Sequence, residues 1–247
     1  MTPAPDQSRA FAPSENGSAP HGGLRPDHRQ PNHARAAPPD RILLIACGAL
    51  AREVLALRSQ RGLDHVGLIC LPAKLHNSPE RIPGAVRATV ARHRGHYAQI
   101  KLLYADCGTG GALAALCEEL GLEMLPGAHC YAVYDGVARF AARAEMRSFF
   151  LTDFLVRQFD AFVWRPLGLD RHPELRDAYF GNYRTLVHLA QVDAPETAAL
   201  AESHAARLGL AFERRLTGYG DLGVSLDGWA RPDGPRSARS LGASPPR

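Results

Sequence analysis

The chain has no long apolar run. Nowhere do about 18 or more apolar residues follow one another, which is the length that a membrane-spanning helix needs. The N-terminus also lacks the charged-then-apolar layout of a secretory signal. We therefore expect a protein without a membrane partner, located in the cytoplasm.

Cysteine is scarce, and clusters of basic residues are missing. Five cysteines, an odd number, are spread over 247 residues, so we expect reduced thiols and no disulfide framework. The formal net charge is only +4, and no run of Lys and Arg is interleaved with aromatic residues, as single-strand binders require. Nucleic acid is therefore not an expected partner.

Both ends of the chain have few large apolar side chains. Residues 1–40 are rich in Pro, Ala, Gly, Ser, Asn and His, and Phe11 and Leu24 are almost their only large apolar side chains. Residues 228–247 have the same character. Such segments cannot bury enough surface to offset the entropy that ordering costs. We expect disordered tails on either side of a single α/β domain at residues 41–227.

Short apolar runs alternate with helical patterns in the first half of the chain. Residues 41–46 form a continuous apolar run that is typical of a strand covered on both faces, and helical spacing follows it. This alternation predicts a mostly parallel sheet with flanking helices, a Rossmann-like three-layer α/β fold. The further strands are expected at residues 65–70, 100–104 and 122–125, and the helices at 49–60, 78–92 and 112–120.

After Asp135 the periodicity is mainly helical, and it predicts a helical C-terminal half. Thr152-Asp153 is a candidate helix cap among large apolar residues. Helices are expected at residues 173–189 and 195–208, each with proline near its first turn, and a closing strand at residues 211–216.

Several thiols and imidazoles follow the predicted strands directly. In an open parallel sheet, ligands bind outside the carboxyl ends of the strands. Cysteine sulfur and histidine nitrogen are the ligands that zinc and other thiophilic metals prefer. The pattern therefore predicts a metal site, although no spacing is a Cys-x-x-Cys knuckle and buried structural cysteine is the alternative. The candidate ligands are Cys47, His76, Cys107 and Cys130.

His129 directly precedes Cys130, and adjacent residues of an extended segment point to opposite sides. We therefore assign Cys130 as the ligand and His129 as an acid–base group or a partner of the ligands. Cys70 and Cys117 are expected to pack in the core. His188 is expected to have a surface or packing role.

A glycine-rich turn opens the predicted helix at residues 112–120. Unpaired N–H groups at a helix start attract anions, so Gly108, Thr109, Gly110 and Gly111 are candidates for binding a phosphate or carboxylate. The turn is neither a P-loop nor a dinucleotide fingerprint. The alternative is that these glycines only shape a tight connection.

Four motifs carry a family resemblance. Through them the chain resembles the bacterial and archaeal family known as domain of unknown function 1638, over most of residues 41–221. Many relatives have Arg-x-His-Asp-Cys where this chain has Gly127-Ala-His-Cys130, without the acidic residue. The motifs read Ala46-Cys47-Gly48, Leu75-His76-Asn77-Ser78-Pro79-Glu80, Tyr104-Ala-Asp-Cys107-Gly108 and His129-Cys130.

The resemblance implies a metabolic pathway, because the gene neighbours of this family encode corrinoid proteins, methyltetrahydrofolate methyltransferases and cobalamin reactivation proteins. The leading hypothesis is an accessory protein or metal-dependent enzyme of corrinoid-linked methyl transfer, with zinc or another thiophilic metal binding a small-molecule substrate. In this hypothesis the corrinoid is bound by a partner, such as a corrinoid protein or a methyltransferase, and not by this chain itself. The alternative is a non-catalytic binding module for an anion or a corrinoid protein, and a third hypothesis is thiol redox chemistry.

Overall fold

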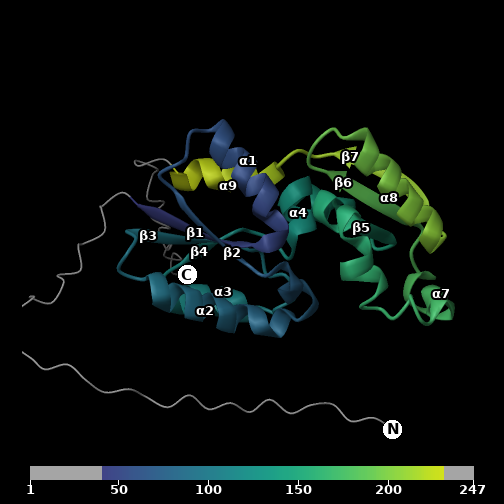
Figure 1. The fold of residues 1–247 in the computed structure, drawn as a ribbon, viewed down its shortest axis with the longest axis horizontal. Coiled ribbons are helices and arrows are strands. Elements are labelled where there is room, and N and C mark those ends of the chain that lie inside the picture. The colour runs from purple at the N-terminus through teal and green to yellow at the C-terminus, as the bar shows by residue number, and fades with distance from the viewer. Residues whose placement is uncertain (1–40, 231–247) are drawn as a thin grey trace, which may run out of the picture. The chain divides into compact units, whose positions relative to one another are not determined.

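The computed structural model describes residues 41–230, which form two all-parallel β-sheets flanked by helices (Figure 1). The predicted α/β class with parallel strands is therefore confirmed. The tails predicted for residues 1–40 and 228–247 lie outside the described residues, apart from residues 228–230.

The first sheet has the strand order β2-β1-β3-β4, and all of its strands are parallel. Its central strand β1 is the predicted continuous apolar run, which is buried on both faces because helices cover both sides of the sheet. The strands are β1 (Ile42–Cys47), β2 (Gly67–Leu71), β3 (Gln99–Leu103) and β4 (Glu123–Met124).

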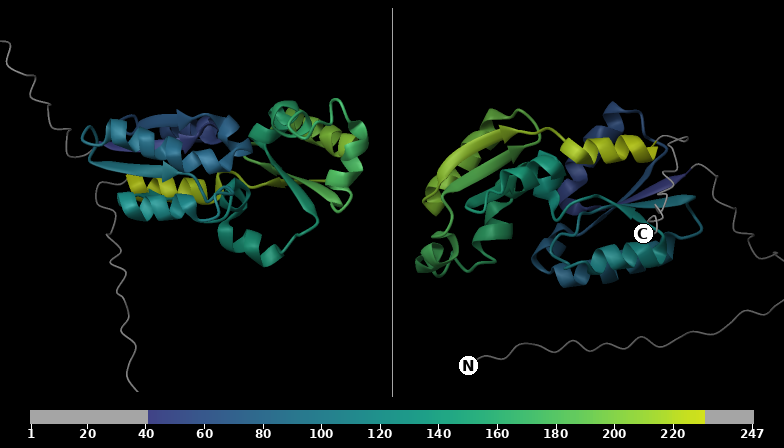
Figure 2. Two further views of the ribbon diagram at one scale, coloured as in Figure 1. Left: turned by 90° about the horizontal axis from the view of Figure 1, so that it is seen from below. Right: turned by 180° about the vertical axis from the view of Figure 1, so that it is seen from behind.

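Two helices cover each face of the first sheet (Figure 2). Leu43 and Ile45 of β1 pack against α2 and α3, whereas Leu44 and Ala46 pack against α1 and α9. The helices are α1 (Ala51–Gln60), α2 (Ile82–His93), α3 (Ala112–Leu120) and α9 (Gly220–Ala230), with 3-10 turns at Gly48–Leu50, Ala73–Asn77 and Pro79–Arg81.

The second sheet has the order β5-β6-β7, again all parallel. Leu151 and Leu186 pack with α6 and α8 on one face, while Tyr131 and Phe140 from α4 and α5 cover the other. The elements are α4 (Cys130–Asp135), α5 (Val137–Arg143), β5 (Ser148–Thr152), α6 (Asp153–Arg157), a π-helical turn (Asp160–Trp164), a 3-10 turn (Pro173–Leu175), α7 (Arg176–Phe180), β6 (Thr185–Ala190), α8 (Pro195–Leu208) and β7 (Ala211–Leu216).

This second sheet is the main departure from the sequence analysis. The second half of the chain contains further helices, but the helix predicted over residues 173–189 is wrong over most of its length. Only a 3-10 turn (Pro173–Leu175) and α7 (Arg176–Phe180) are helical there, and Thr185–Ala190 is strand β6. Residues 186–190 are all buried, with strands on both edges. A strand buried on both faces cannot be told from a buried helix by periodicity alone. The strand predicted at residues 211–216 is confirmed as β7.

Helix α9 returns the chain to the first sheet after β7. Leu222 and Leu226 enter the core around β1, and Trp229 packs against it, so the tail boundary predicted at residue 228 falls inside this helix. The guanidinium of Arg61, the residue after α1, donates to the Gly223 carbonyl and pairs with Asp227, both at 2.8 Å. None of the helices in residues 41–230 is long and apolar enough to cross a membrane.

Candidate functional site

Three thiols and one imidazole line a small cavity at the carboxyl-terminal edge of the first sheet. The cavity measures about 30 Å³, which is room for roughly one water molecule. Cys47, Cys107, Cys130 and His76 all contribute to its wall, together with Tyr104. The structure thus brings together the four side chains that the sequence analysis assigned to a metal site. We call this space the thiol cavity.

Cys47 is positioned by the end of β1. It is the last residue of the strand and pairs in register with Leu71 of β2. The chain then turns sharply at Gly48, where a Cβ atom would lie 2.8 Å from the Leu71 carbonyl oxygen. Only glycine fits this turn, so Cys47 stays at the edge of the sheet.

Cys107 is held in a conformation that is unusual for a residue with a side chain. Its φ of 51° lies in the left-handed region, where strained residues at functional sites often occur. Its N–H donates to the Ala128 carbonyl at 2.8 Å, and the Asp106 N–H donates to Gly127 at 3.2 Å. These two bonds tie the loop after β3 to the segment before α4, and so they bring Cys107 near Cys130.

The thiol cavity is apolar apart from its three thiols, the His76 imidazole and the Tyr104 hydroxyl. Burial raises the pKa of the Cys107 thiol to about 12, and the neighbouring Cys47 adds to the rise. Burial also raises the pKa values of Cys47 and Cys130 and lowers the pKa of His76. Without a bound cation all four groups are therefore neutral at pH 7. The remaining walls include Leu50, Ile82, Leu125 and Val133.

The Tyr104 hydroxyl is buried beside the cavity without a hydrogen-bond partner among the described residues. It lies next to the Cys47 thiol, and this contact partly offsets the rise that burial causes in the pKa of Cys47. Unpaired buried polar groups are costly, and they often mark the position of a water, an ion or a ligand. A polar occupant of the thiol cavity would satisfy this hydroxyl.

The donor set suits a thiophilic metal, because three sulfurs and one imidazole match the ligands of zinc sites. Within residues 41–230, however, no three His, Cys, Asp or Glu side chains are already arranged around a common ion position. Zinc–sulfur bonds are about 2.3 Å long, so coordination would require the thiol side chains to turn toward a shared centre.

The glycine-rich turn is closed by a carboxylate of the chain itself. Asp106 accepts hydrogen bonds from the Thr109 hydroxyl at 2.7 Å, from Gly110 N–H at 3.1 Å and from Gly111 N–H at 2.8 Å. The Thr109 bond is the main reason that the pKa of Asp106 is lowered. An external anion at Gly108, Thr109, Gly110 and Gly111 would have to displace Asp106, which favours the alternative that this turn shapes the connection.

His129 lies on a different surface from Cys130. Cys130 lines the thiol cavity, whereas His129 lines a separate open cleft together with Tyr131 and Phe140. The segment is extended at His129, with φ −165° and ψ 168°, so neighbouring side chains diverge. Burial lowers the pKa of the His129 imidazole. An acid–base role for His129 stays a prediction.

The two remaining cysteines differ from each other. Cys117 is buried in the core between β1, α2 and α3, as predicted. Cys70 is exposed, so its predicted core position is wrong. The reason is topological, because β2 is an edge strand of the first sheet.

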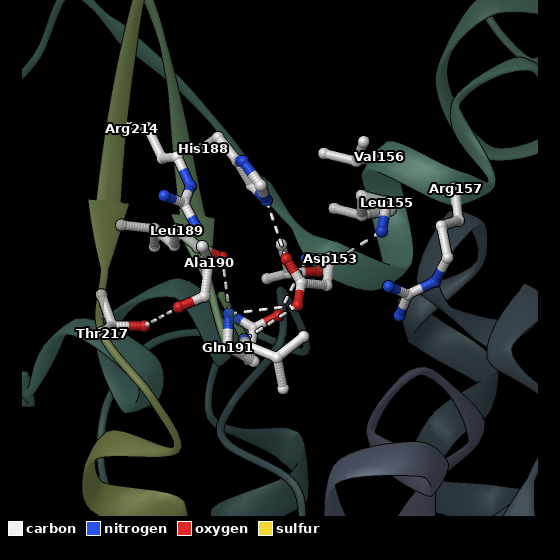
Figure 3. Close-up of polar contacts among 12 residues, drawn as sticks. Asp153, Leu155, Val156, Arg157, His188, Leu189, Ala190, Gln191, Arg214 and Thr217 are labelled. Atoms are coloured by element: carbon white, nitrogen blue, oxygen red, sulfur yellow. Dashed lines mark hydrogen bonds and ion pairs between the residues drawn. The ribbon is translucent and has the colours of Figure 1, made fainter. Parts of the chain in front are cut away.

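A buried polar network that was not predicted from the sequence joins two strands of the second sheet (Figure 3). Asp153 and His188 are each about 1% exposed, and the Asp153 carboxylate lies 2.7 Å from His188 Nε2. The other Asp153 oxygen accepts from the N–H groups of Gln191 and Val192, and the Gln191 side chain accepts from Asp153 N–H at 2.8 Å. This network ties the carboxyl end of β5 to that of β6.

The sequence contained a signal for this network. Thr152 was correctly predicted as a cap, since its hydroxyl accepts from Leu155 N–H at 3.4 Å. The adjacent Asp153 and the histidine inside the apolar run of β6 would have suggested a buried pair. That inference needed the strand assignment of β6, which was missing.

Residues 41–230 thus define a parallel α/β protein with a thiol-lined cavity at its strand ends. The chain matches the family described as "Protein of unknown function (DUF1638)" over residues 70–225, and it belongs to this family. His76, Cys107 and Cys130 lie within the matched segment, and Cys47 lies before it. No curated protein and no solved structure gives a significant match.

Proposed function

We propose that this protein is an accessory protein or enzyme of corrinoid-linked one-carbon metabolism that holds a thiophilic metal, zinc in the first instance. Cys47, Cys107 and Cys130 would supply the sulfur ligands and His76 a nitrogen. One observation carries the proposal: four separate segments deliver these donors to a single space of ion size. Core packing alone does not require an imidazole beside three thiols.

The site itself supports a role beyond packing. The left-handed conformation of Cys107 is strained, and Asp106 closes the turn that follows it. Together these features direct the Cys107 thiol toward the cavity. The unpaired Tyr104 hydroxyl offers a hydrogen bond to whatever lies there. When bound by thiolates, zinc lowers the pKa of an incoming thiol and so favours its attack on a methyl group.

The pathway part of the proposal rests on the family resemblance alone, which implies a genomic neighbourhood of corrinoid and methyltransferase proteins. Methyl transfer from a methylcorrinoid to a small thiol would break the cobalt–carbon bond and form a sulfur–carbon bond. The thiol proton would go to water, and the cobalt would keep the electron pair as Co(I). If the zinc-loaded protein accelerates this reaction, the pathway is supported. If it does not, the pathway is contradicted, whereas the metal assignment is not affected.

The metal assignment is tested by the metal content of purified full-length protein after zinc loading and dialysis. We expect about one zinc per chain in the wild type and strongly reduced zinc in Cys47→Ser, Cys107→Ser and Cys130→Ser, because each removes one sulfur ligand. Cys70→Ser and Cys117→Ser are the matched controls, since neither residue lines the cavity.

Two results would contradict the metal assignment: wild-type protein that stays free of zinc, or cavity variants that retain as much zinc as the controls. The alternative function, an anion-binding module, would appear as salt-sensitive phosphate binding that survives loss of all three thiols. The pairing of Asp106 with the glycine-rich turn makes that outcome the less expected one.

A further inference from the structure

A second, much larger cavity lies on the other side of the His129-Cys130 dipeptide. It is an open cleft of about 550 Å³, within the range of roughly 300–1,000 Å³ that small-molecule sites occupy. It is lined by elements of the second sheet and its cover, chiefly α4, α5 and the start of β5. We call it the aromatic cleft.

Connected aromatic rings form the floor of the aromatic cleft. The His129 ring centroid lies 5.2 Å from Tyr131 and 5.0 Å from Phe140, and Phe150 lies 5.0 Å from Phe140. Tyr183 adds a further ring to the wall. Rings at these separations present faces and edges to a flat guest, which gains stacking in addition to apolar burial.

The polar groups of the cleft are few, and its one charged lining residue, Glu145, is balanced by Arg215, which also pairs with Glu213. The Glu145 carboxylate is held by both terminal nitrogens of Arg215, at 2.6 and 2.7 Å, so neither charge is free. Ser148 contributes a hydroxyl to the lining, and Met146 is 88% exposed at the rim. This balance favours an uncharged ligand.

His129 offers one directed hydrogen bond to the cleft. Its Nδ1 accepts from the Ala132 N–H at 3.4 Å, which places the proton of the neutral ring on Nε2. Within the described residues Nε2 has no hydrogen-bond partner. The His129 Nε2–H group is therefore able to donate a hydrogen bond to a ligand.

We propose that the aromatic cleft binds a small uncharged molecule with a flat aromatic ring that carries a hydrogen-bond acceptor. The ring stacks on the Tyr131, Phe140 and Phe150 floor, and the acceptor meets the His129 Nε2–H. The proposal goes beyond the metal assignment and does not depend on it, because no residue of the thiol cavity wall lines the cleft.

Two matched probes test the proposal by calorimetric titration of the full-length protein: 1-methylbenzimidazole, which has a ring acceptor nitrogen, and 1-methylindole, which lacks one. We expect both to bind and the first to bind about fivefold more tightly, as one hydrogen bond implies. His129→Phe keeps a ring but removes the donor, and it should abolish the difference between the probes.

A cleft-filling variant keeps the test independent of that substitution. Ala141 is exposed on α5 and lines the cleft, whereas Ala138 is exposed on the same helix outside it. Ala141→Trp should weaken both probes at least tenfold, and Ala138→Trp should change neither. The proposal is overturned if the wild type binds neither probe at millimolar concentration, or if Ala141→Trp binds both as the wild type does.

Discussion

Asp153 is the central residue of the buried polar network at the carboxyl ends of β5 and β6. Its carboxylate contacts the His188 ring and two backbone N–H groups, and its own N–H is bound by Gln191. Its position at the first residue of α6 joins the β5 end to the loop after β6. No solvent reaches the pair, so a lost partner cannot be replaced by bulk water.

Replacement of this carboxylate should therefore be costly. We expect Asp153→Asn to lower the free energy of unfolding by about 3 kcal/mol, because the amide cannot accept all three bonds and leaves buried donors unpaired. The matched control is Asp193→Asn, which removes a mostly exposed partner of Arg214 and should cost less than about 1 kcal/mol. Urea unfolding measures both, and equal losses would show that burial of Asp153 has no special weight.

At the scale of elements, the backbones of α4 and α9 approach each other closely. Gly220 begins α9 with a φ of 46°, and a Cβ atom there would overlap the backbone carbonyls of Val133 and Tyr134. The neighbouring Asp221 accepts from the Val137 N–H at 2.8 Å, so the corner between α4 and α5 is fastened to the start of α9.

Two glycines of α9 should respond in opposite directions. Gly220→Ala should lower the free energy of unfolding by more than about 2 kcal/mol, because it combines a left-handed φ with overlap against backbone. Gly228→Ala, in the same helix with open space around it, should raise the free energy by about 0.4–1 kcal/mol. Thermal or urea unfolding would reveal the signs, and a neutral Gly220→Ala would contradict the close approach.

The elements also show what the sequence could and could not predict. β1 was predicted because its apolar run ends at Cys47-Gly48, and the convergence of Cys47, Cys107 and Cys130 followed from the rule that parallel strand ends share an edge. β6 was missed because helix and fully buried strand look alike in one sequence. The Asp153–His188 pair was missed with it, since the pair depends on the register between β5 and β6.

At the scale of residues 41–230, each sheet has its own core, yet the chain passes between them more than once. Residues of the first sheet's core come from β1 and from α9, with the whole second sheet between them in sequence. The single domain predicted for residues 41–227 stays a prediction, and this return of the chain is the feature on which it can be tested.

The two tryptophans allow that prediction to be measured. Trp164 packs in the core of the second sheet and Trp229 in the core of the first. Variants that keep one tryptophan, Trp164→Phe and Trp229→Phe, should show fluorescence unfolding midpoints that match the circular dichroism midpoint of the same variant, because the halves unfold together. If fluorescence and circular dichroism gave separate midpoints within either variant, the two sheets would be independent domains.

The return of α9 also sets an order of events during synthesis. Leu222 and Leu226 complete the apolar layer over β1, but translation reaches them only after about 175 further residues have been added since that strand. At roughly 5–20 residues per second, this side of β1 waits on the order of ten seconds or more with only α1 covering it. During that interval the exposed face of β1 is a natural client for ribosome-associated chaperones.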